Sequence, residues 1–111
     1  AVAALHAMGV HRTEKRTEIL LIESVPEGIF EQDVIDVFGQ FDGFIKLAAV
    51  PNVGGTFIAE YQSKSTASDS QDALDGFTYP EFPELQLRVS FVRAADVGDM
   101  WNAISRTPGT L

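Results

Sequence analysis

The hydrophobic positions of this chain follow two different periods. Apolar runs typical of strands cover residues 18–25, 44–50, 56–61 and 85–92. Between the first two runs, apolar residues repeat with the spacing of one helical face, and we expect this face to point into the core. They are Phe30, Val34, Val37, Phe38 and Phe41. A second helix is predicted over 63–75, because Ser and Thr residues cap its start and Gly76 ends it.

The predicted order is therefore β-α-β-β-α-β, which indicates an α+β, ferredoxin-like sandwich. Such a chain forms a four-stranded antiparallel sheet with two helices on one face. A further helix is predicted over 96–105, with Asp96 as its N-cap. Its apolar residues form one stripe that we expect to pack on a partner or fold back over the open sheet face. They are Val97, Met100, Trp101 and Ile104.

Length and composition restrict the class of protein. The chain has 111 residues, which is one domain's worth, and 45% of them are hydrophobic, so wholesale disorder is excluded. It has no Cys and no apolar run of membrane-spanning length, so we expect a protein of a reducing compartment without a membrane span. We expect three segments: a flexible basic arm over 1–17, a domain over 18–93 and a helical extension over 94–111.

Net charge bears directly on the choice of partner. The chain carries −8, and an acidic surface repels the phosphates of nucleic acids. The one basic cluster, Arg12, Lys15 and Arg16, lies in the arm.

The sequence contains no recognisable catalytic motif. Both histidines, His6 and His11, lie in the arm, away from the predicted domain. No nucleophile-base pair, metal-ligand pattern or cofactor motif can be argued from the spacing. We therefore expect a non-enzymatic protein without cofactor or metal.

Several short motifs lie at matching places in this pattern. They are residues 25–27 (Val-Pro-Glu), 37–44 (Val-Phe-Gly-Gln-Phe-Asp-Gly-Phe), 59–61 (Ala-Glu-Tyr), 72–77 (Asp-Ala-Leu-Asp-Gly-Phe) and 89–91 (Val-Ser-Phe). Through them residues 18–93 resemble an RNA recognition motif (RRM), and more narrowly those of the spliceosomal A and B-double-prime proteins of small nuclear ribonucleoprotein particles (snRNPs). This resemblance implies a nuclear snRNP subunit in pre-mRNA splicing, with a small nuclear RNA and a leucine-rich-repeat protein as partners. A second stretch, 80–88, resembles the dimerising RNA-binding proteins with multiple splicing, which implies a homodimer.

The resemblance also identifies where RNA would bind, and there this chain departs from the family. RRMs stack bases on aromatic side chains of the two central strands. The corresponding positions here are Leu21, Thr56 and Ile58, and none is aromatic. Strand alternation places them on the open face with Glu23. The candidate RNA-binding residues are thus Leu21, Glu23, Thr56 and Ile58 on this face, Arg12, Lys15 and Arg16 in the arm, and Arg88 and Arg93 near the end of the fourth strand.

Two functions follow from these observations. One is an RRM subunit of a ribonucleoprotein particle that is held largely by protein contacts and binds RNA weakly by itself. The alternative is a protein-interaction or dimerising RRM without significant RNA binding.

Overall fold

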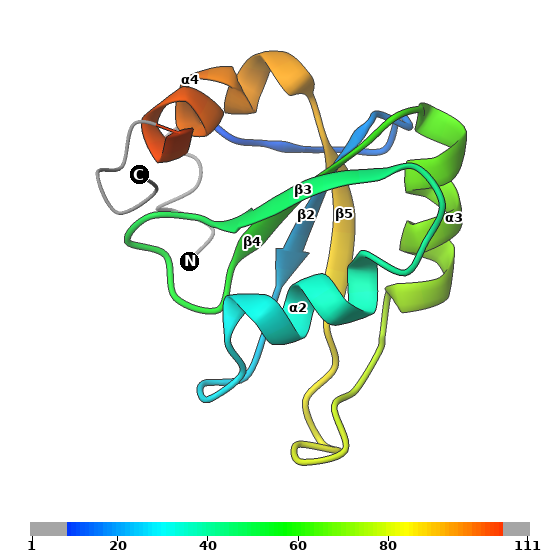
Figure 1. The fold of residues 1–111 in the computed structure, drawn as a ribbon, viewed down its shortest axis with the longest axis vertical. Helices are drawn as coiled ribbons and strands as arrows, with labels where there is room; N and C mark the ends of the chain where they lie inside the picture. The colour runs from blue at the N-terminus through cyan, green and yellow to red at the C-terminus, as the bar shows by residue number, and fades with distance from the viewer. Residues whose placement is uncertain (1–8, 106–111) are drawn as a thin grey trace.

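The protein folds into a five-stranded antiparallel sheet with two helices on one face and a third helix placed apart from them (Figure 1). The computed structural model describes residues 9–105, except for the side chains of 99–100 and 102–105. The elements are β1 (Arg12–Thr13), β2 (Ile19–Glu23), α2 (Glu31–Phe38), β3 (Phe44–Ala49), β4 (Phe57–Tyr61), α3 (Lys64–Leu74), β5 (Arg88–Val92) and α4 (Ala94–Ser105). The expected β-α-β-β-α-β sandwich is confirmed, and the strand order is β1-β5-β2-β4-β3.

β2 is a central strand that is buried on both faces. It pairs with β4 on one side and β5 on the other, and all five of its residues are buried. Its residues 19–22 are all apolar, as is typical of a strand covered on both faces. The face opposite α2 and α3 is therefore not open.

The two helices of the sandwich begin with different capping devices. At α3 the Ser63 hydroxyl accepts a hydrogen bond from the Thr66 N–H at 3.1 Å, as the Ser-rich start predicts. At α2 the N-cap residue is Phe30, whose side chain cannot cap. The Asp33 carboxylate instead accepts a bond from the Phe30 N–H at 2.9 Å. α2 ends at Phe38, three residues before the predicted end at Phe41: the Gly39 N–H makes the last helical bond, to the Ile35 carbonyl, and the Phe41 N–H bonds three residues back, to the Phe38 carbonyl.

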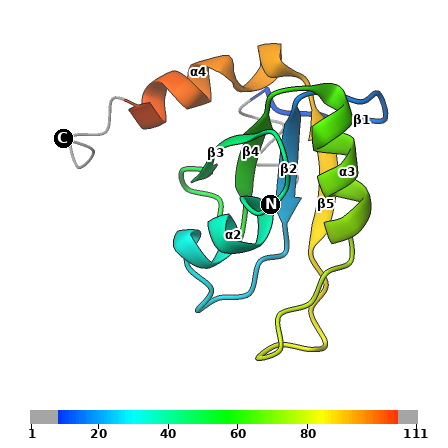
Figure 2. The ribbon, with the colours of Figure 1, turned by 45° about the vertical axis from the view of Figure 1, so that its right-hand side comes forward.

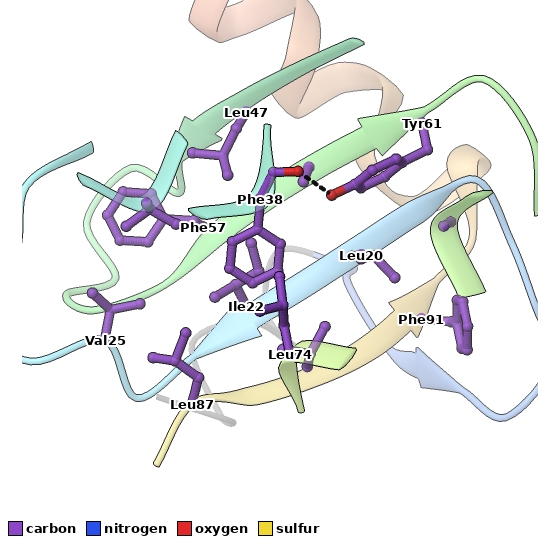
Figure 3. Packing of buried hydrophobic residues seen from close by; sticks show 14 of the residues in the cluster. Leu20, Ile22, Val25, Phe38, Leu47, Phe57, Tyr61, Leu74, Leu87 and Phe91 are labelled. Carbon is purple, nitrogen blue, oxygen red and sulfur yellow. Dashed lines mark hydrogen bonds between the residues drawn. The ribbon is translucent and has the colours of Figure 1, made fainter. Parts of the chain in front are cut away.

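The first core lies between the sheet and α2 and α3. Figure 3 shows its side chains converging from both layers. Tyr61 reaches across it, and its hydroxyl donates to the Phe38 carbonyl at 2.9 Å and shares a 2.7 Å hydrogen bond with the Ser70 hydroxyl. This buried phenol is fully satisfied, so β4 is tied to both helices by polar contacts as well as by packing.

Phe30 and the N-terminal arm differ from the sequence-based expectations. Phe30 was expected in the core but is 72% exposed, because it precedes α2 and does not continue the helical face. Residues 12 and 13, assigned to a flexible arm, form β1 and extend the predicted four-stranded sheet by pairing with β5. α4 begins at Ala94, so Asp96 lies in its first turn and is not its N-cap.

Candidate nucleic-acid interface

The three expected stacking positions lie together on the sheet face opposite α2 and α3. Leu21 of β2 is directly opposite Ile58 of β4, and Thr56 immediately precedes β4. The exposed fraction is 1% for Leu21, 0% for Ile58 and 2% for Thr56. A base needs an exposed and preferably aromatic surface to stack on. None of the three positions offers one in this conformation.

A second hydrophobic cluster contains two of these positions, Leu21 and Ile58. It consists of Val10, Ile19, Leu21, Val50, Val53, Ile58, Val92 and Val97, with Trp101 packed against it. Among the described residues, three segments outside the four central strands supply its cover: residue 10 before β1, the turn after β3, and α4. In Figures 1 and 2 α4 lies apart from α2 and α3, at another side of the sheet. The chain therefore covers its own sheet.

α4 contributes two described side chains to this cover. Val97 is fully buried, and Trp101 is half-buried against the cluster. The Lys46 ammonium of β3 lies 4.3 Å from the centre of a Trp101 ring and 3.7 Å from a Glu60 carboxylate oxygen. A cation at this distance over an indole is attracted by the ring's electrons. The predicted stripe residues Met100 and Ile104 have side chains outside the described part of the chain.

Glu23 is buried at the edge of the same face and is neutralised by the arm. The Arg12 guanidinium donates to one Glu23 carboxylate oxygen from Nη2 at 2.6 Å and from Nε at 2.9 Å. Glu23 has a side chain only 8% exposed, against 26% for Arg12. A buried carboxylate needs such a partner to compensate its desolvation. Arg12 is therefore engaged within the fold, although the sequence made it a candidate for RNA.

The other predicted cations are dispersed. Lys15 and Arg16 are exposed beyond β1, and Arg88 is exposed opposite Glu23 in the β2–β5 register. Arg93 forms an ion pair of 3.0 Å with Asp96 in the first turn of α4. Strand register thus places Arg88 next to the Arg12–Glu23 pair at the edge of this face, whereas Arg93 is engaged with Asp96.

Three covering residues, Val10, Val50 and Val53, were missed from the sequence. Val50 and Val53 flank a turn in which Asn52 has a φ of 64° and the Val53 N–H donates to the Val50 carbonyl at 3.3 Å. Apolar residues within a Pro-Asn-Gly-rich turn were the available signal, since a fully solvated turn would not need them.

The helix side of the molecule is acidic. Exposed carboxylates lie along α2 and α3 and in the loop that follows: Glu31, Asp33, Asp36, Asp69, Asp72 and Glu81. Burial first, and then the negative charges of Asp33, Asp36 and Glu81, together raise the pKa of Tyr79 to about 12. This side therefore presents a negative surface to any partner.

Other kinds of site are not formed by the described residues. Among them no group of His, Asp and Glu side chains could hold a metal ion. In the same part of the chain no helix is long and apolar enough to cross a membrane.

Solved structures with the same arrangement are RRM domains. The RRM3 domain of Gbp2 has a TM-score of 0.65 at 20% identity, covering 77% of this chain and 85% of that one. The RRM of RNA15 has a TM-score of 0.62 at 16% identity, covering 76% of this chain and 99% of that one. The C-terminal RRM of MEC-8, solved bound to AGCACA, has a TM-score of 0.53 at 24% identity, covering 66% and 87%. Neither a protein-family model nor a curated protein matches the chain. This chain therefore has the RRM fold.

Proposed function

We propose that this chain is a non-catalytic RRM subunit of a ribonucleoprotein assembly, held there mainly by protein contacts and with weak affinity of its own for RNA. The proposal rests on the burial of Leu21, Thr56 and Ile58, of which Leu21 and Ile58 belong to the cluster that the chain's own segments cover. Where an RRM would stack bases, this one has an aliphatic core.

The charge distribution supports the same proposal. RNA binding depends strongly on cations that meet the phosphates. The chain carries −8, and two of the candidate cations, Arg12 and Arg93, are paired with carboxylates. Lys15, Arg16 and Arg88 remain as exposed cations for auxiliary RNA contact.

The narrower assignment rests on the resemblance of residues 18–93 to the spliceosomal A and B-double-prime proteins. It extends the proposal to an snRNP subunit in the nucleus, with a small nuclear RNA and a leucine-rich-repeat protein as partners. MEC-8 supports the wider RNA setting, since its C-terminal RRM domain has the same fold and was solved bound to AGCACA.

We expect the full chain to bind random single-stranded RNA with a Kd above about 10 μM at physiological salt, because three stacking sites worth roughly 1–3 kcal/mol each are missing. Fluorescence anisotropy with a pool of labelled random RNA oligonucleotides measures this. Submicromolar binding to the pool would contradict the proposal.

A matched pair of variants shows where any residual binding arises. Replacing Lys15 and Arg16 together by Ala should weaken it and flatten its salt dependence, because fewer counterions are released. Replacing Lys64, an exposed cation on the helix side, should leave the salt slope unchanged. Equal slopes for both variants would exclude a role for the arm.

A protein-interaction or dimerising RRM without RNA binding is the second candidate. The covered sheet favours this second candidate, because a buried sheet face leaves no surface on which RNA bases could stack. Sedimentation of the full chain distinguishes a homodimer from a monomer that awaits a different partner.

A further inference from the structure

Phe30 is the N-cap residue of α2, and neither helix capping nor core packing explains an aromatic side chain at this position. N-cap residues are usually Ser, Thr, Asp or Asn, whose side chains accept bonds from the first helical N–H groups. Phe30 makes no such bond, and its ring is 72% exposed, so it does not contribute to the core either. A large aromatic side chain that neither caps nor packs is available for a binding partner.

A pocket of about 500 Å³ begins at the residue before Phe30. Its apolar wall is formed by Val25, Pro26, Ile29 and Phe57. Val25 and Phe57 lie at the same end of the first core, as Figure 3 shows. The β2–α2 and β3–β4 loops both line the pocket. They are joined by a hydrogen bond in which the Val25 N–H donates to the Gly55 carbonyl at 3.1 Å.

The floor of the pocket is fixed by this contact. Gly55 has a φ of 67°, and a Cβ there would lie 2.7 Å from the Val25 carbonyl oxygen. Only glycine therefore allows the two loops to approach so closely. The pocket is formed before any ligand arrives, which lowers the entropy cost of binding.

The surroundings of the pocket are negative. Glu27 lines it, and Glu31 follows Phe30 as the first residue of α2, where its carboxylate accepts a bond from the Ala49 N–H at 3.3 Å. The sequence contains no Lys or Arg between Arg16 and Lys46. A positive ligand is attracted to this rim and the phosphates of RNA are repelled, so the surface favours a protein over a nucleic acid.

We propose that Phe30 and the adjoining pocket bind a basic segment of a partner protein, with one apolar side chain of that segment in the pocket and Lys or Arg side chains on Glu27 and Glu31. This inference rests on the proposed function, because it specifies the kind of protein contact that holds the subunit. It assigns the contact to the end of the molecule where the β2–α2 and β3–β4 loops meet.

Synthetic peptides test the proposal on the full chain. The probe is a fluorescein-labelled nonapeptide of alternating Lys and Arg with one central Trp. Two matched peptides replace the Trp by Ala, or all basic residues by Glu. We expect anisotropy to show that the Trp peptide binds at least about tenfold more tightly than the Ala peptide, and that the Glu peptide does not bind.

Three variants locate the site. Phe30→Ser should weaken binding about tenfold, equivalent to about 1.4 kcal/mol, while thermal unfolding stays unchanged or rises because Ser is a better N-cap. Glu27→Lys should weaken binding and reduce its salt dependence. Ile45→Ser is the control, since Ile45 is 49% exposed near the start of β3, away from the turn after that strand. It should bind as the unchanged chain does.

The failures of the two proposals are distinguishable. Equal peptide binding by the unchanged chain and Phe30→Ser, or no binding of the Trp peptide at all, would overturn the docking site. Tight binding of random RNA would overturn the proposed function, whatever the peptides do. Submicromolar RNA binding that is lost in Phe30→Ser would show that the pocket accepts a base, and it would contradict both proposals.

Discussion

Replacing Ile58 by Glu should lower the free energy of unfolding by about 3 kcal/mol, because an apolar side chain is lost from the second cluster and a carboxylate takes its place. Ile58 is fully buried under α4 and its neighbours. On an open RRM sheet the same position would face water and the substitution would be mild. The size of the effect therefore reports on whether the sheet is covered.

Ile45→Glu is the matched control for this experiment. It makes the same chemical change on the same sheet, at a side chain that is 49% exposed. We expect it to cost about 1 kcal/mol or less, as surface substitutions do. Urea denaturation followed by circular dichroism compares the two. Similar losses for Ile58→Glu and Ile45→Glu would show that the second cluster is not formed.

Replacing Arg12 by Ala should destabilise the protein by about 2 kcal/mol, since it leaves the buried Glu23 carboxylate without a counter-charge. Both bonds to that carboxylate, at 2.6 and 2.9 Å, come from this one guanidinium. β1 consists of Arg12 and Thr13 alone, so its pairing with β5 should weaken as well.

Two further variants separate the charge effect from a general loss of contacts. Adding Glu23→Leu to Arg12→Ala should recover most of the lost stability, because no uncompensated charge then remains. Arg93→Ala removes a pair in which the Arg93 side chain is 64% exposed and the Asp96 side chain is 11% exposed. It should cost less than Arg12→Ala, because Asp96 lies in the first turn of α4, where the helix dipole also stabilises a carboxylate. If urea denaturation gives equal losses for Arg12→Ala and Arg93→Ala, the pair with Glu23 is not structural.

The sequence predicted the sandwich because each element carries its own local signal. Ser63 caps α3, Asp33 supports the start of α2, and the apolar period of 30–41 differs from that of the strands. The end of α2 was placed too late, since Phe41 continues the apolar spacing although the backbone turns at Gly39. A helical period reports which residues are apolar, and it does not report where the hydrogen bonding stops.

The cover of the sheet was harder to predict because it depends on contacts between distant segments. Arg12 was interpreted as a free cation, since nothing in its neighbourhood points to Glu23 eleven residues later. The all-apolar stretch of β2 was the usable signal that both faces are buried. Phe30 shows the opposite error, in which a correct helical spacing includes a residue that lies outside the helix.

Trp101 is the single Trp of the chain, so its fluorescence reports directly on whether the sheet is covered. Its fluorescence should be blue-shifted and poorly quenched by acrylamide in the isolated, unchanged protein, since the indole packs on the second cluster beside Lys46. The same signal should move to the red in Ile58→Glu, as α4 leaves the sheet. A fully solvent-like Trp101 spectrum in the unchanged protein would show that α4 does not cover the sheet.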